Sequence, residues 1–231
     1  MLGRIPTATH IWNTIFNQQD QKLKHITKIE YIDDVKCRVI LDTFDVLELD
    51  TFTVSTSPLK EGEDVEDEVL EGVIFECDCI NAQKESIKYL SSRMRTAKQL
   101  AKHLAEKGYD GKIIDLTIDR ISSWGYIDDA AYARTFIEYR LSSSKKSWRA
   151  IEYDLKLEGV PKDVILEVLS EYEKDECERA LEVSLKIVKD RRDEKTLKRL
   201  QGSLARNGFY WDAISYALKQ LGHEEDEDWN E

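Results

Sequence analysis

Apolar residues recur every four positions in three stretches of the chain, and each series ends one turn before a glycine. The glycines are Gly108, Gly159 and Gly208, which lie 51 and 49 residues apart. The apolar positions around them are Leu100, Leu104, Ile114 and Ile118; Ile151, Leu155, Ile165 and Leu169; and Leu200, Leu204, Ile214 and Leu218. Apolar residues four apart line one face of an α-helix, and glycine is favoured where a helix ends in the left-handed conformation. The pattern therefore predicts three copies of a helix–turn–helix.

A further amphipathic helix is expected before each of these pairs. The expected helices cover about residues 82–93, 129–141 and 177–188, with inward-facing residues Ile87 and Leu90; Ala133, Phe136, Ile137 and Leu141; and Ala180, Leu181, Leu185 and Val188. Self-similarity with a period of roughly 20–50 residues is typical of repeat proteins, and a unit of about 50 residues buries little apolar surface alone. The sequence therefore predicts a mainly α fold of three tandem three-helix repeats that stack on one another.

The residues before the repeats differ, because apolar and polar side chains alternate there as in β-strands. Strands are expected at residues 26–32, 36–41, 44–49 and 52–54, and the acidic segment 61–76 is expected to form a helix that leads into the repeats. Such a small strand-rich N-terminal extension needs a surface to pack on, and the first repeat offers one. The predicted divisions are an N-terminal arm of little order (1–24), the extension with its acidic linker helix (25–81), three repeats (82–127, 128–173 and 174–222) and an acidic tail (223–231).

Charge is distributed unevenly along the 231 residues, whose formal net charge is −12. Residues 1–81 hold 7 basic against 17 acidic side chains, residues 82–222 hold 27 against 23, and residues 223–231 hold none against 6. The repeats are thus mildly basic between two acidic ends. This distribution permits a nucleoprotein partner, but it argues against strong non-specific binding of the whole chain to DNA, because that binding grows with the number of phosphates neutralised.

Few residues suggest chemistry. The four cysteines are Cys37, Cys77, Cys79 and Cys177. They form no CxxC pair and indicate free thiols in a reducing cytoplasm. No apolar run approaches the roughly 18 residues of a membrane span, and no phosphate-binding or metalloprotease motif is present. Asp128 and Asp129 invite a metal interpretation, but acids just before a helix are typical N-caps, and one of the two is expected to cap the helix that follows. Neither an enzyme nor a bound cofactor is expected.

Several segments together resemble the RecX family. The first repeat carries the segment 89–96 followed by Leu100, Leu104 and Gly108; the link to the second repeat reads Gly125-Tyr126-Ile127-Asp128-Asp129, followed by Tyr132 and Ala133; and the second repeat carries Arg140, Leu141, Trp148, Ile151, Leu155 and Gly159. The match covers residues 82–222, and residues 25–81 are similar to the strand-rich extension of Gram-positive members. Each motif alone is common, whereas their joint order and spacing are fairly specific to the family.

The resemblance implies a cytoplasmic regulator of RecA recombinase in DNA repair and recombination. Members of the family are stacks of three-helix repeats that bind in the groove of the RecA–DNA filament and inhibit its ATPase and strand exchange. The expected partner is therefore the RecA filament, with the single-stranded DNA inside it as a further contact, and the expected state is a monomer without catalytic activity. One departure is the turn at residues 142–148, which lacks the glycine and proline common in the family, although Ser147 can still cap the next helix.

Basic residues at the junction of the first two repeats are the candidate filament-binding residues, because a curved stack of repeats presents an extended surface suited to a filament. They are Arg93, Arg95, Arg140, Lys145, Lys146 and Arg149. For each one, the alternative is a solvated surface charge. Two other functions stay open for the chain: a helical-repeat nucleic-acid-binding protein that acts without RecA, and a protein-interaction scaffold. A period near 50 speaks against a tetratricopeptide scaffold, whose period is about 34.

Overall fold

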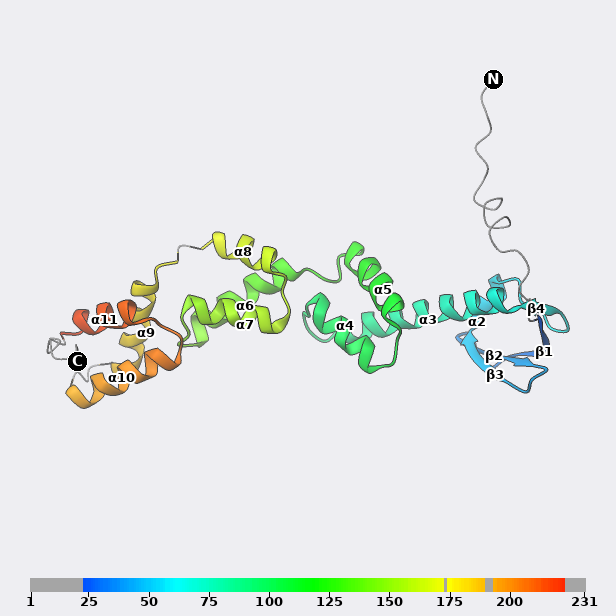
Figure 1. Cartoon of the computed structure of the whole chain (residues 1–231), viewed down its shortest axis with the longest axis horizontal. Coiled ribbons are helices and arrows are strands. Elements are labelled where there is room, and N and C mark those ends of the chain that lie inside the picture. The colour runs from blue at the N-terminus through cyan, green and yellow to red at the C-terminus, as the bar shows by residue number, and fades with distance from the viewer. Residues whose placement is uncertain (1–22, 173, 190–192, 223–231) are drawn as a thin grey trace, which may run out of the picture. The chain divides into compact units, whose positions relative to one another are not determined.

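A computed structural model describes residues 23–172, 174–189 and 193–222 (Figure 1). Residues 1–22, which make up most of the predicted N-terminal arm, lie outside these described residues. The exceptions in the arm are Leu23 and Lys24, which begin strand β1 and pair with Glu66 and Val65. The predicted acidic tail at 223–231 lies outside the described residues altogether.

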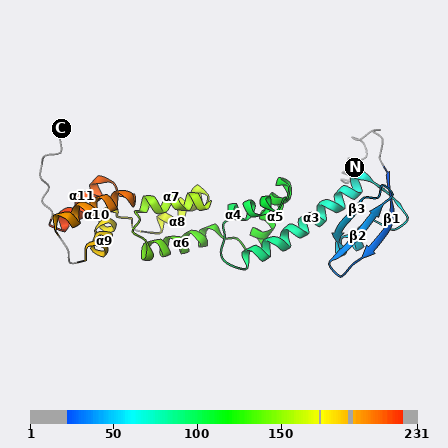
Figure 2. The same ribbon diagram turned by 90° about the horizontal axis from the view of Figure 1, so that it is seen from below.

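The N-terminal part is a four-stranded antiparallel sheet in the order β3-β2-β1-β4 (Figures 1 and 2). The strands are β1 (Leu23–Tyr31), β2 (Lys36–Leu41), β3 (Val46–Asp50) and β4 (Asp64–Glu66). One face is apolar and buried, with Ile26, Val39 and Leu49 packed in the same cluster as Leu70 and Val73 of helix α3 (Asp67–Leu90). The sheet is thus stabilised by a helix that covers it, as a small sheet requires.

Two details of this part correct the sequence prediction. The strand expected at residues 52–54 is instead the short helix α2 (Thr51–Thr56), because the carboxylate of Asp50 accepts the backbone N–H of Thr53 at 3.1 Å and caps a helix there. The helix expected at residues 61–76 begins only at Asp67, after β4, and then continues without a break to Leu90. The separate first helix expected at 82–93 is therefore the second half of α3.

The remaining helices follow in pairs and triplets as the periodicity predicts. They are α4 (Ala97–Glu106), α5 (Gly111–Ser123), α6 (Asp129–Ser143), α7 (Trp148–Glu158), α8 (Lys162–Ser170), α9 (Glu176–Val188), α10 (Glu194–Arg206) and α11 (Trp211–Gln220). The predicted inward residues of α4, α7 and α10 are fully buried. Leu185 and Ile87 were wrongly expected to face inward, since they are 47% and 38% exposed, and Ile118 is only half-buried. The mainly α fold with a strand-rich extension is confirmed.

The three repeated glycines have the left-handed backbone that the pattern predicts. Gly108, Gly159 and Gly208 have φ angles of 92°, 92° and 93°, respectively. After two of them the chain folds back onto the helix that has just ended, because the N–H of Val160 donates to the carbonyl of Leu155, and an equivalent bond is made after Gly208. These are Schellman-type helix ends.

Two compact units divide the described chain. One holds the residues up to Glu85 together with Tyr109–Thr117, and the other holds Ser86–Gly108 and the residues from Ile118 onward. Within the second unit, the cores of α6–α8 and of α9–α11 are separate clusters, one around Ile151 and Leu155 and the other around Leu200 and Leu204. The repeat limits at residues 82, 128 and 174 stay a prediction. No described helix is both long and apolar enough to cross a membrane.

Candidate partner-binding surface

The six candidate cations lie on two segments of the second unit. Arg93 and Arg95 belong to the loop between α3 and α4, and the others follow one another from the end of α6 to the first turn of α7. Their surroundings differ, and the contacts that each one makes decide which charges are available to a partner.

Two of the six are engaged by one carboxylate. Asp154 on α7 has a side chain only 13% exposed, and its Oδ2 accepts from the ammonium of Lys146 at 2.5 Å and lies 3.5 Å from the guanidinium of Arg140. The Arg140 guanidinium also lies over the Phe136 ring, 4.8 Å from its centroid. A carboxylate this buried needs its cations, so Arg140 and Lys146 hold α6, the following loop and α7 together rather than presenting free charge.

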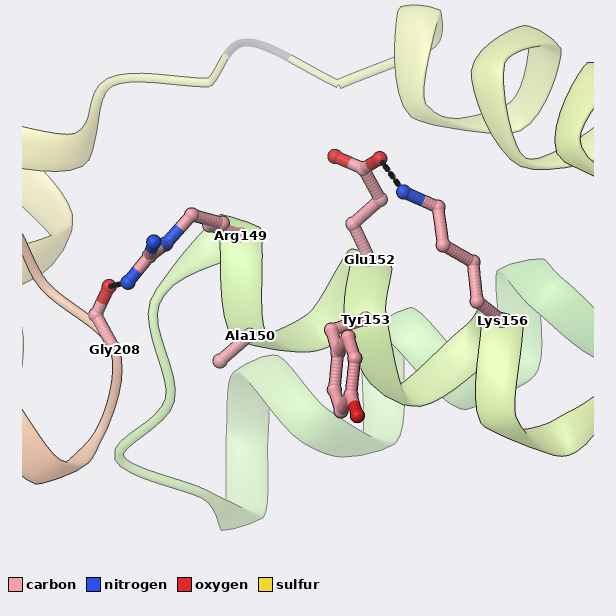
Figure 3. A pocket seen from close by; sticks show the side chains of 6 residues that line it. All are labelled: Arg149, Ala150, Glu152, Tyr153, Lys156 and Gly208. Carbon is pink, nitrogen blue, oxygen red and sulfur yellow. Dashed lines mark hydrogen bonds and ion pairs between the residues drawn. The ribbon is translucent and has the colours of Figure 1, made fainter.

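Arg149 joins the second and third repeats. Its guanidinium donates to the Tyr210 hydroxyl at 2.6 Å and to the Gly208 carbonyl at 3.1 Å, and it lies 3.9 Å from the centroid of the Tyr210 ring. The bond to Gly208 borders an open groove of about 400 Å³ that is also lined by Tyr153 and by the Glu152–Lys156 ion pair (Figure 3). Arg149 is therefore exposed but already bonded within the chain.

The three remaining cations differ in their contacts. Arg95 stacks on Tyr89, with its guanidinium carbon 4.4 Å from the ring centroid, and Tyr89 in turn stacks on His103 at 3.9 Å between ring centroids. Arg93 and Lys145 are exposed and make no hydrogen bond or ion pair with any residue in the part of the chain that the structure describes. Of the six candidates, these two have the charges most available to another molecule.

Sequence reasoning missed the residue that organises the loop carrying Lys145. Arg179 on α9 is 5% exposed, and its guanidinium donates to the backbone carbonyls of Leu141, Ser144 and Lys146 at 3.1–3.3 Å and to the carboxylate of Glu182 at 2.7 Å. These bonds fix a turn that has neither glycine nor proline. The only signal in the sequence was an arginine on the inner side of a helix that is otherwise lined mainly by apolar residues.

Joints between the middle helices of the repeats (α4, α7 and α10) connect successive repeats. The hydroxyl of Thr96, the N-cap of α4, donates to the carbonyl of Glu158 at the end of α7, and a side chain on Gly159 would collide with Lys98. In the second joint, the N–H of Ser147, the N-cap of α7, donates to the carbonyl of Asn207 at the end of α10. The start of one middle helix therefore meets the end of the next.

Asp128 and Asp129 have separate tasks, and only one of them caps its own helix. Asp128 accepts the N–H of Ala131 at 2.8 Å at the start of α6, as predicted. Asp129 instead accepts the N–H of Ala97 at 3.1 Å in the first turn of α4, and burial raises the pKa of its carboxyl. Among the described residues, no group of three His, Cys, Asp or Glu side chains could hold a metal ion. Asp128 therefore caps α6, and Asp129 connects α6 of the second repeat to α4 of the first.

Comparison with protein families matches two segments of the chain to consecutive models. Residues 84–120 match the first three-helix domain of RecX, and residues 128–169 match its second three-helix domain. The chain belongs to the RecX family. The two matches fall on α3–α5 and on α6–α8, which are the helices that the joint at Thr96 connects.

Relatives and solved structures agree with this assignment. A regulatory protein RecX of Geobacillus kaustophilus is 31% identical over 74% of this chain, and the match spans 65% of the length of that relative. One from Clostridium acetobutylicum is 29% identical over 85% of this chain and 95% of its own length. A crystal structure of a regulatory protein RecX, at 19% identity, superposes with a TM-score of 0.62 over 85% of this chain and 99% of its own. The crystal structure of RecX from Lactobacillus salivarius, at 21% identity, superposes with a TM-score of 0.54 over 62% of this chain and 96% of its own.

The structure explains the glycine and the two aspartates of the RecX motif at residues 125–129. Gly125 has a φ of 76° and ends α5, and the N–H of Tyr126 returns to the carbonyl of Ile121 at 3.2 Å. The following aspartates then bond to two different helices, as described above. The motif is therefore a structural joint of the RecX repeats, and its acids are engaged within the chain.

Proposed function

We propose that this chain regulates RecA recombinase by binding as a monomer to the RecA–DNA filament in the cytoplasm and inhibiting its ATPase and strand exchange. The observation that carries the proposal is the ordered match of two RecX three-helix domains to residues 84–120 and 128–169. The relatives are named regulatory proteins, and the proposal assigns no reaction to this chain.

The contacts of the six cations refine which residues carry the binding. A cation that is already paired with a shielded carboxylate has little charge left for a partner, whereas an exposed cation steers association and contributes at the rim of an interface. We therefore assign direct contact with acidic RecA surface or filament DNA to Arg93 and Lys145. Arg140, Lys146, Arg149 and Arg95 hold these two segments in place.

The test is the ATPase rate of RecA on single-stranded DNA, titrated with this protein, beside its binding to naked DNA. We expect loss of ATPase at concentrations that leave naked DNA unbound. The double variant Arg93→Glu/Lys145→Glu should need at least about tenfold more protein for the same inhibition, which corresponds to about 1.4 kcal/mol. Its matched control is Lys162→Glu, another exposed lysine, on α8.

The two other functions are outcomes of this experiment. Unchanged ATPase together with tight, salt-dependent binding to naked DNA would favour a nucleic-acid-binding protein that acts without RecA. Unchanged ATPase without DNA binding would favour an interaction scaffold. Full inhibition by the double variant would still support the regulation of RecA but would mean that Arg93 and Lys145 are not its binding residues.

A further inference from the structure

The outer face of α10 carries a stripe of cations. Lys195, Arg199 and Arg206 lie at positions i, i+4 and i+11 of the helix, and Gly202 at i+7 completes the row. At about 100° per residue, all four fall within about 60° of one another around the helix axis and span about 16 Å along it. The opposite face holds Leu197, Leu200 and Leu204, which are buried. We call these four residues the α10 stripe.

The charges of the α10 stripe are not used within the described chain. Acids do begin this helix, but the carboxylate of Asp193 caps Thr196, and Glu194 pairs with Lys198 at 2.6 Å. Lys195, Arg199 and Arg206 make no hydrogen bond or ion pair with any other described residue. Gly202 places no side chain between them. A Cβ at that position would touch only the end of the Arg206 side chain, at 3.4 Å. The stripe is therefore a continuous cationic surface.

The acidic C-terminal segment is attached close to this surface. Helix α11 follows α10 after a connection of four residues and packs against it, so it runs back toward the end at which α10 begins (Figure 1). The described chain stops at Gly222, and residues 223–231 follow with six acids and no lysine or arginine. Nine residues reach about 30 Å when extended, which is more than the length of the stripe.

We propose that the acidic segment 223–231 docks on the α10 stripe of its own chain. Opposite charge and a short connection act together, because tethering the two groups gives an effective concentration in the millimolar range. The docked segment occupies the cationic surface that would otherwise attract nucleic-acid phosphates or the acid-rich surface of another molecule. This inference does not rest on the proposed action on RecA.

Carbodiimide cross-linking of the full chain tests the docking directly, because the reagent joins a lysine amine to a carboxylate in contact with it. We expect amide links between Lys195 and residues 223–231 that fall at least fivefold in 1 M NaCl, where the screening length is about 3 Å. The Lys198–Glu194 pair is an internal positive control, and the exposed Lys162 is a negative one. Links to the segment that are no more frequent from Lys195 than from Lys162 would overturn the proposal.

Two further arms separate the other occupants of the stripe. In an equal mixture of ¹⁴N- and ¹⁵N-labelled chains, links should join equal isotopes. Docking on a second copy would instead make about half of the links mixed and would refute the intramolecular contact. A variant that ends at Gly222 should bind a 20-nucleotide oligothymidylate several-fold more tightly than the full chain at low salt. That gain should vanish with Lys195→Gln/Arg199→Gln/Arg206→Gln, and equal binding by both chains would mean that the stripe is not covered.

Discussion

The hydroxyl of Thr96 donates a hydrogen bond of 2.8 Å to the backbone carbonyl of Glu158, 62 residues later in the chain. Thr96 caps the start of α4, and Glu158 ends α7. One side chain therefore bonds to a backbone group at the end of each helix. Its oxygen also accepts the N–H of Gln99 at 3.2 Å. A helix cap and a contact between repeats therefore depend on the same buried atom.

Replacing this residue should cost more stability than an ordinary cap does. Thr96→Ala removes the cap, typically worth about 1 kcal/mol, and the bond to Glu158, worth about another 1 kcal/mol. We expect a loss of about 2 kcal/mol in the free energy of unfolding, measured with urea. Thr96→Ser should restore most of it. Asp128→Ala, which removes a cap without such a bond, should cost about half as much.

The three repeated glycines should differ in their tolerance of a side chain. All have positive φ, which costs alanine about 1 kcal/mol. A Cβ at Gly159 would lie 2.6 Å from the Lys98 side chain, and one at Gly208 would lie 2.8 Å from the Ser147 hydroxyl, whereas one at Gly108 meets nothing within 4 Å. We expect Gly159→Ala and Gly208→Ala to destabilise the chain by about 1–3 kcal/mol more than Gly108→Ala in thermal unfolding. Equal losses would contradict the tight joints.

The sequence was sufficient for these helices but not for the way in which they meet. Leu100, Leu104 and Gly108 report a local period and a local helix end, and the same signals repeat near residues 159 and 208. The partner of Thr96 depends instead on how two repeats stack, which a period does not reveal. The helix at α2 was missed for a local reason, because the alternation of Phe52, Thr53 and Val54 outweighed the capping signal of Asp50.

The candidate cations show the same limit. Residue type and spacing gathered six of them at one junction, yet the structure ties four of the six to neighbours within the chain. Which cation is bonded within the chain depends on Asp154 and Tyr210, whose roles are visible only after folding. Arg179 was missed because a buried arginine on an apolar helix face has no recognisable motif.

Removing the guanidinium of Arg179 should loosen the loop that carries Lys145. Arg179→Met keeps much of the side-chain volume but leaves three backbone carbonyls without their donor and removes one of the two cations paired with Glu182. We expect a loss of about 3 kcal/mol and faster amide exchange at residues 142–147. In contrast, Arg134→Met breaks an exposed pair with Glu171 and should leave the unfolding midpoint close to that of the wild type. Unchanged exchange in the loop would argue against its control by Arg179.

The half-buried carboxyl of Asp129 should make stability depend on pH. Burial raises its pKa above the ordinary value of 3.8, so the folded state binds a proton more readily than the unfolded state does. Stability from this group therefore falls as pH rises from 3.8 through the raised pKa, and the loss is complete above that pKa. Asp129→Asn retains an acceptor for Ala97 and should remove this slope from the pH profile of unfolding. The difference profile between wild type and variant should be flat if the carboxyl does not titrate in this way.

Helix α7 carries both halves of the joint between repeats, a serine cap at its start (Ser147) and a glycine turn at its end (Gly159). A duplicated second repeat would bring its own cap and its own turn, and deleting that repeat would leave the threonine cap of α4 to meet the glycine turn at the end of α10. The number of repeats can therefore change by whole units during evolution without a new interface having to arise.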